Sequence, residues 1–91
     1  MGLSYGPQAL SNVARELDAA AEAGYTQVVL DLDGWASLPD EAIRGLITLL
    51  REARRLNLDM LAETTTAAVR EDFVRAGLDR LIPLRRREAA A

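Results

Sequence analysis

The chain has 91 residues, of which 49% are hydrophobic and 27% are charged, and its formal net charge is −3. This length and composition predict one globular domain over residues 1–91. The sequence contains no cysteine, histidine or lysine. These absences exclude disulfides, Cys/His metal sites, imidazole acid–base catalysis and lysine-based chemistry. The acidic balance argues against a nucleic-acid partner.

No stretch of the sequence approaches the roughly 20 apolar residues that a membrane-spanning helix needs. The first six residues lack the basic start and the apolar run of a secretion signal. No glycine-rich phosphate loop is present, so no nucleotide is implied. We therefore expect a cytoplasmic protein that binds no cofactor or metal and does not insert into a membrane.

The first predicted element is a helix that begins at Pro7, because a proline costs little at a first helical position. Gly24 is expected to end this helix as a left-handed cap. The segment 27–32 follows as a short strand, and it is too apolar for a strand with one solvated face. The apolar positions of the helix are Leu10, Val13, Leu17, Ala20 and Ala21.

Residues 37–41 combine several signals that predict the start of a second helix. Ser37 is the expected capping residue, Pro39 follows early, and Asp40 and Glu41 face the positive end of the helix dipole. Asn57 is the expected left-handed stop. The apolar stripe of this helix consists of Ile43, Leu46, Ile47, Leu50 and Ala53.

The rest of the chain repeats the alternation of strand and helix. Residues 58–62 are predicted as an interior strand, and residues 64–66 offer a cap for a third helix that Gly77 closes. Residues 81–84 form a last strand, which Pro83 places at a sheet edge. The tail, residues 85–91, is expected to be a solvated helix start or a frayed end. This order predicts an α/β fold with a small, mostly parallel sheet and crossover helices.

One motif suggests an enzyme. Asp31-Leu32-Asp33-Gly34 after an apolar strand resembles the first motif of haloacid-dehalogenase-type phosphatases, in which the first Asp is the nucleophile. Thr64, which follows the second predicted strand, is similar to that family's second motif. The chain nevertheless has no lysine to hold a phosphate, Trp35 replaces the expected threonine, and no later acidic pair is available for magnesium. The alternative is a turn at the end of a strand, completed by Gly34.

A second resemblance covers much more of the chain. The sequence has Val-Val-Leu-Asp-Leu-Asp-Gly at 28–34, Pro-Asp-Glu-Ala-Ile at 39–43, Val-Arg at 69–70 and Gly-Leu-Asp-Arg-Leu at 77–81. In this order and spacing it resembles the STAS domain, found in bacterial anti-sigma factor antagonists and in the cytoplasmic tails of sulfate transporters. The resemblance implies an α/β/α arrangement and a non-enzymatic module that works by binding a protein partner.

The resemblance also implies a departure at the regulatory turn. In the antagonists, an Asp-Ser-Ser-Gly turn carries the serine that a partner anti-sigma kinase phosphorylates, and the added charge breaks their complex. Here the matching residues are Pro39, Asp40, Glu41 and Ala42, so Glu41 takes the place of the switch serine. A carboxylate carries about one negative charge where a phosphoserine carries ~1.5 to 2. The acidic pair either imitates phosphorylation permanently or simply stabilises the helix start.

Five residues are candidates for partner binding. Trp35, the only tryptophan, is expected to pack over the sheet, although an exposed tryptophan here would be a good interface anchor. Ser37 is the only hydroxyl near the turn, so it is also a weak candidate for phosphorylation. The full set is Asp33, Trp35, Ser37, Asp40 and Glu41.

The start of the chain leaves room for one short strand at most, whereas STAS domains begin with two more strands before the first helix. We therefore expect an N-terminally shortened domain, either with Leu3-Ser4-Tyr5 as a minimal strand or with a homodimer or partner segment covering the sheet. The leading function is an anti-sigma antagonist-like regulator without the phosphorylatable serine. The alternative is a scaffold or accessory subunit of a transport or signalling complex.

Overall fold

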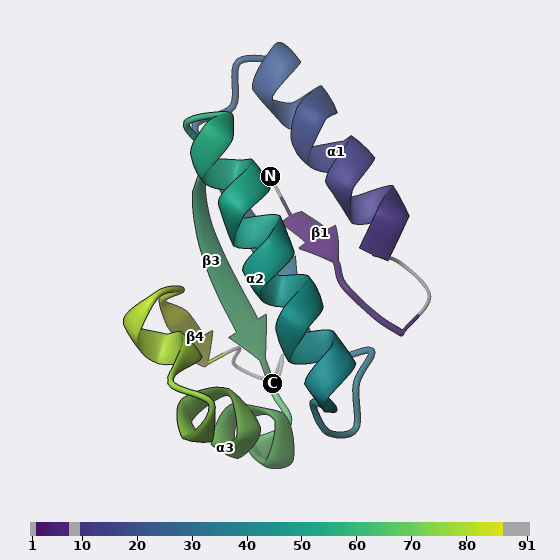
Figure 1. The fold of residues 1–91 in the computed structure, drawn as a ribbon, viewed down its shortest axis with the longest axis vertical. Coiled ribbons are helices and arrows are strands. Elements are labelled where there is room, and N and C mark those ends of the chain that lie inside the picture. Colours follow the sequence, from purple (N-terminus) through teal and green to yellow (C-terminus); the bar gives the residue numbers. More distant parts are fainter. Residues whose placement is uncertain (1, 8–9, 87–91) are drawn as a thin grey trace, which may run out of the picture.

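A four-stranded, fully parallel sheet is the centre of the computed structural model, which describes residues 2–7 and 10–86 (Figure 1). Its strands lie side by side in chain order: β1 (Gly2–Ser4), β2 (Gln27–Asp31), β3 (Asp59–Thr64) and β4 (Leu84–Arg86). The helices are α1 (Leu10–Glu22), α2 (Asp40–Arg55) and α3 (Ala67–Arg75), followed by the 3₁₀ turn η1 (Leu78–Arg80).

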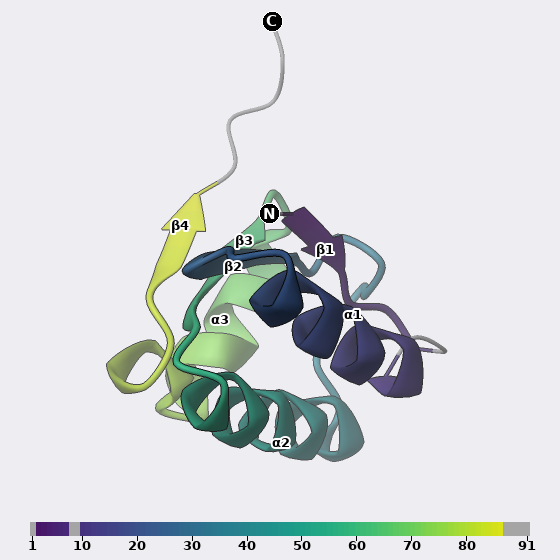
Figure 2. The same cartoon turned by 90° about the horizontal axis from the view of Figure 1, so that it is seen from above.

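The three α-helices all lie on one face of the sheet (Figure 2). Strands that follow one another in chain order, joined by crossovers of one hand, place every connecting helix on the same side. The α/β class and the parallel sheet are thus confirmed. The described residues form two layers, however, so the expected α/β/α layering is wrong for this part of the chain.

Burial alternates along the strands as this layering requires. In β2, Val28 and Leu30 are fully buried against the helices, whereas Val29 and Asp31 face the other side and are partly exposed. The prediction that this strand is covered on both faces is therefore wrong, since Val29 is its only apolar residue on the uncovered side. By strand register, that side carries Gly2, Ser4, Gln27, Val29, Asp31, Asp59, Leu61, Glu63 and Arg85.

The core lies between the sheet and the helices. Val13, Leu17 and Ala20 of α1 are buried as expected, while the side chain of Leu10 lies outside the described part. In α2 the buried stripe is turned slightly from the predicted one, because Ile43 and Ile47 lie at its margin. The stripe consists of Ala42, Gly45, Leu46, Leu49, Leu50 and Ala53.

The predicted helix stops are confirmed. Gly24, Asn57 and Gly77 have φ angles of 87°, 58° and 75°, the left-handed conformation that ends a helix. The expected start of α1 at Pro7 is not confirmed, because Pro7 lies in a turn and residues 8 and 9 are outside the described part. The short N-terminal strand is present as β1.

The last strand differs from the sequence-based prediction. Residues 81–83 are not a strand, because they form the turn that follows η1, and Ile82 is buried there. The strand begins at Leu84 instead, and Arg85 forms an ion pair with Glu63 of β3. Arg85 and Arg86 therefore belong to a strand rather than to a helix start or frayed end, while residues 87–91 lie outside the described part.

The one-sided burial of β2 predicts different costs for the same substitution at adjacent positions. Val28→Thr should lower the free energy of unfolding by about 1–3 kcal/mol, because it buries a hydroxyl without a partner. Val29→Thr should change it by less than about 0.5 kcal/mol, because the hydroxyl remains accessible to water. Urea unfolding of both variants measures the difference, and equal costs would mean that the second face is covered.

Candidate functional site

The loop between β2 and α2, residues 32–39, is held by three buried side chains. Leu32, Trp35 and Leu38 are 0%, 8% and 5% exposed. Gly34, Ala36 and Ser37 between them are exposed, Asp33 is partly exposed, and Pro39 after them is exposed. A loop anchored at every third residue holds its intervening positions in a fixed arrangement at the surface.

Asp33 joins this loop to the end of β3. Its Oδ1 accepts hydrogen bonds from the hydroxyl of Thr64, at 2.9 Å, and from the backbone N–H of Thr65, at 2.8 Å. The fully buried hydroxyl of Thr64 also accepts from the N–H of Thr66, at 3.1 Å. The Asp31 carboxylate accepts from the N–H of Asp33, at 2.9 Å, which is an Asx turn. Asp33 thus has a structural role inside the protein.

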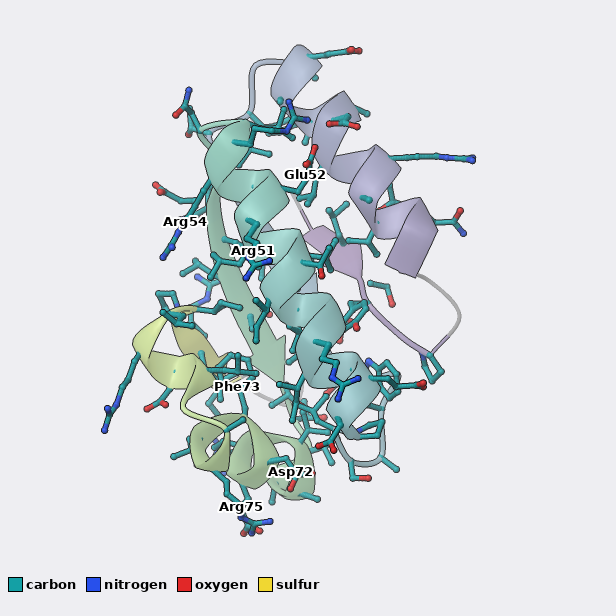
Figure 3. The ribbon with its side chains drawn as sticks, in the orientation of Figure 1. Arg51, Glu52, Arg54, Asp72, Phe73 and Arg75 are labelled. Atoms are coloured by element: carbon teal, nitrogen blue, oxygen red, sulfur yellow. The ribbon has the colours of Figure 1, made fainter. Side chains whose placement is uncertain are left out.

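Asp72 of α3 fixes the other end of the loop. Its Oδ2 accepts from the backbone N–H of Leu38 at 3.0 Å, and its Oδ1 lies 3.5 Å from the Nη1 of Arg75. Figure 3 shows Asp72 and Arg75 on α3, below the first turn of α2. Nothing in the local sequence indicates this role of Asp72, because its partner lies 34 residues away and no motif links the two.

Trp35 packs against Tyr5, with ring centroids 5.7 Å apart and an interplanar angle of 54°. The burial of Trp35 confirms the expectation that it packs in the core over the sheet. The Tyr5 hydroxyl donates to the carbonyl of Ala42 at 3.0 Å and thereby ties the segment after β1 to α2. Burial, and secondarily the Glu41 carboxylate, raises the pKa of Tyr5.

Gly6 and Gly34 allow the segment after β1 and the loop after β2 to approach each other closely. A Cβ on Gly34 would lie 3.2 Å from the Cα of Gly6, which is tighter than ordinary packing allows. A cavity of about 170 Å³ beside this contact is lined by Trp35 and Glu41, among others. Among the described residues, the buried indole N–H of Trp35 has no hydrogen-bond partner.

The first turn of α2 differs from the prediction. Its N-cap is Pro39, whose carbonyl accepts from the N–H groups of Ala42 and Ile43 at 2.9 and 3.1 Å. No side chain caps the helix, so the expected capping role of Ser37 is wrong. The extended backbone of Pro39 delays the helix start to Asp40, which places Ser37 out of reach of the first helical amides.

The five candidate residues therefore separate into two groups. Ser37, Asp40 and Glu41 are exposed on one anchored segment, while Asp33 and Trp35 hold that segment in place. The structure also joins Asp33 to Thr64, the two positions that resemble phosphatase motifs. Among the described residues, no group of three acidic side chains is placed to hold a metal ion.

A family model for the STAS domain matches residues 8–91 of this sequence. The chain belongs to the STAS domain family. Searches of curated proteins and of solved structures found no match. STAS domains are generally non-enzymatic modules for protein interaction or regulation, which fits a site made of an exposed loop and a helix start.

No helix in residues 2–7 and 10–86 is long and apolar enough to cross a membrane. The longest, α2, has 16 residues and charged side chains along its outer face.

The Thr64 hydroxyl offers a test of how the loop is held. Thr64→Val should lower the free energy of unfolding by about 1–3 kcal/mol, because it removes the hydroxyl that donates to Asp33 and takes away the acceptor of the Thr66 N–H. Thr48→Val is the matched control, since the hydroxyl of Thr48 is exposed and bonds only its own helix. Urea unfolding compares the two variants, and equal stabilities would show that the Asp33 contact does not hold the loop.

Proposed function

We propose that this chain is an anti-sigma antagonist-like regulator that binds a protein partner through a permanently charged surface, without a phosphorylation switch. The surface consists of Ser37, Asp40 and Glu41, and we call it the acidic turn. The observation that carries the proposal is the exposure of Glu41 in the first turn of α2, at the position where the STAS antagonists have their switch serine.

The geometry supports recognition by a fixed surface. The loop before α2 is anchored by the buried side chains of Leu32, Trp35 and Leu38. Because the loop is already fixed, little conformational entropy is lost when a partner binds the acidic turn. The two carboxylates lie beside the uncapped N-terminus of α2. Acidic side chains at the edge of an interface mainly set the association rate and the choice of partner. A partner with a cationic surface is therefore expected.

The proposal includes a non-enzymatic role and keeps the cytoplasmic location expected from the sequence. The Asp33 carboxylate, which corresponds to the acid/base of the phosphatase motif, already accepts two hydrogen bonds from the end of β3. A group engaged in this way is poorly placed to transfer a proton.

An activity assay tests the non-enzymatic role. We expect the chain to release no phosphate from p-nitrophenyl phosphate in the presence of magnesium. Release above the buffer rate that disappears in Asp31→Asn, the counterpart of the phosphatase nucleophile, would contradict the proposal and restore the enzyme interpretation.

Neutralising the acidic turn tests the binding surface. A tagged chain is used to isolate partners from its native cells, and the recombinant partner is then titrated against the variants. Asp40→Asn/Glu41→Gln should weaken binding about tenfold, a loss of about 1.4 kcal/mol, and the affinity of the unmodified chain should fall with added salt. Glu16→Gln, which neutralises an exposed acid on α1, is the control. Equal binding by both variants would place the interface elsewhere.

Glu41→Ser distinguishes a fixed contact from imitation of phosphorylation. If the carboxylate contacts the partner directly, the serine variant should bind as weakly as a Glu41→Gln variant. If the carboxylate instead imitates the phosphorylated, released state, the serine variant should bind more tightly than the unmodified chain. Isothermal titration calorimetry separates the two results.

A further inference from the structure

A second surface lies at the other end of α2. A groove of about 360 Å³ runs between the C-terminal half of this helix and residues 81–83, over the beginning of β3. Its lining includes Leu50, Arg54, Met60, Leu81 and Pro83. Leu50 and Arg54 follow Glu41 by nine and thirteen residues on α2, so the groove is about 14–20 Å from the acidic turn along the helix. The two surfaces are therefore separate.

The groove exposes an unpaired stretch of strand edge. β4 pairs only with residues 62–64 of β3, so residues 59–61 have no strand on that side. The N–H of Asp59 donates to Thr26 on the β2 side, and the N–H of Ala62 donates to Pro83 on the β4 side. By the alternation of a parallel ladder, Met60 directs its N–H and C=O toward the groove. Pro83 has no N–H with which to reach the Met60 carbonyl.

Apolar side chains form the floor and one wall of the groove. Met60 and Leu50 are buried at its base, at 4% and 7% exposed, whereas Leu81 is 46% exposed at its side. Leu81 is one of three large hydrophobic side chains that are exposed among the described residues. An exposed leucine beside a buried apolar floor offers an apolar ligand contacts on two sides.

Positive charge lies along the helix wall. Arg51 and Arg54 are exposed, and within the described residues neither forms an ion pair, in contrast to Arg55, which pairs with Glu52 and Asp18. In Figure 3, Arg54 extends from α2 on the side away from α1, beside β3. Arg54 and Asp59 are the two charged residues of the lining, and Arg51 is exposed one turn before Arg54 on the same helix, so positive charge is concentrated on the helix side of the groove.

We propose that this groove binds a short, extended segment of a partner protein that carries an apolar side chain next to acidic residues. The apolar side chain packs between Leu50 and Leu81, and the acidic side chains meet Arg51 and Arg54. The backbone of the segment pairs with the free N–H and C=O of Met60, as in other peptides that add to a strand edge. This proposal does not depend on the acidic turn.

Selection from a random peptide library displayed on phage tests the proposal on the whole immobilised chain. The enriched peptides should contain Asp or Glu next to Leu, Ile or Phe. The most enriched peptide is then synthesised with a fluorescent label, and its affinity is measured by anisotropy. Arg54→Glu and Leu81→Glu should each weaken binding at least tenfold, and Arg51→Glu should weaken it severalfold. Circular dichroism establishes that each variant is folded.

Arg15→Glu is the matched control, because Arg15 is exposed on α1 and forms no ion pair among the described residues. It should leave the affinity unchanged. Three results would overturn the proposal: no peptide is enriched, the enriched peptides lack acidic residues, or Arg15→Glu weakens binding as much as Arg54→Glu. Loss of binding only in Asp40→Asn/Glu41→Gln would also overturn the proposal, because it would show that the peptide binds the acidic turn and not the groove.

Discussion

The order of the strands is the constraint on which the other features depend. Because four parallel strands follow one another in chain order, every helix lies on one face and every strand ends at the same edge of the sheet. The loops after β2 and β3 therefore meet, and the Asp33–Thr64 hydrogen bond forms there. The same order sets α2 across the molecule, with its first turn at the carboxyl edge and its last turn near the amino end of β3 (Figure 1).

Local signals in the sequence predicted the elements well. Gly24, Asn57 and Gly77 end their helices because a left-handed residue stops a helix wherever the chain continues. Signals that depend on distant partners were less reliable. The sequence of a short apolar strand does not show whether one face or both faces are covered. Val29 therefore did not indicate that its side of the sheet is uncovered. The shift of the last strand to Leu84 follows from the burial of Ile82, which periodicity alone does not reveal.

The candidate site shows the same division between local and distant information. The exposure of Asp40 and Glu41 follows from their place in the first turn of an amphipathic helix, which is a local property. The roles of Asp72 and Thr64 depend on partners 34 and 31 residues away. The motif that resembles a phosphatase arises from this geometry, because a turn at the end of a parallel strand needs acceptors for free N–H groups. Asp31 and Asp33 supply such acceptors here, for the N–H groups of Asp33 and Thr65.

The amino-acid composition limits which kinds of charged side chain the two surfaces can present. Every charge on the acidic turn is a carboxylate, and every positive charge near the groove is a guanidinium. The sequence contains no histidine, the side chain whose charge ordinarily changes between pH 5 and 8. Because both proposed surfaces are charged and exposed, we expect binding at either end of α2 to weaken as the ionic strength rises.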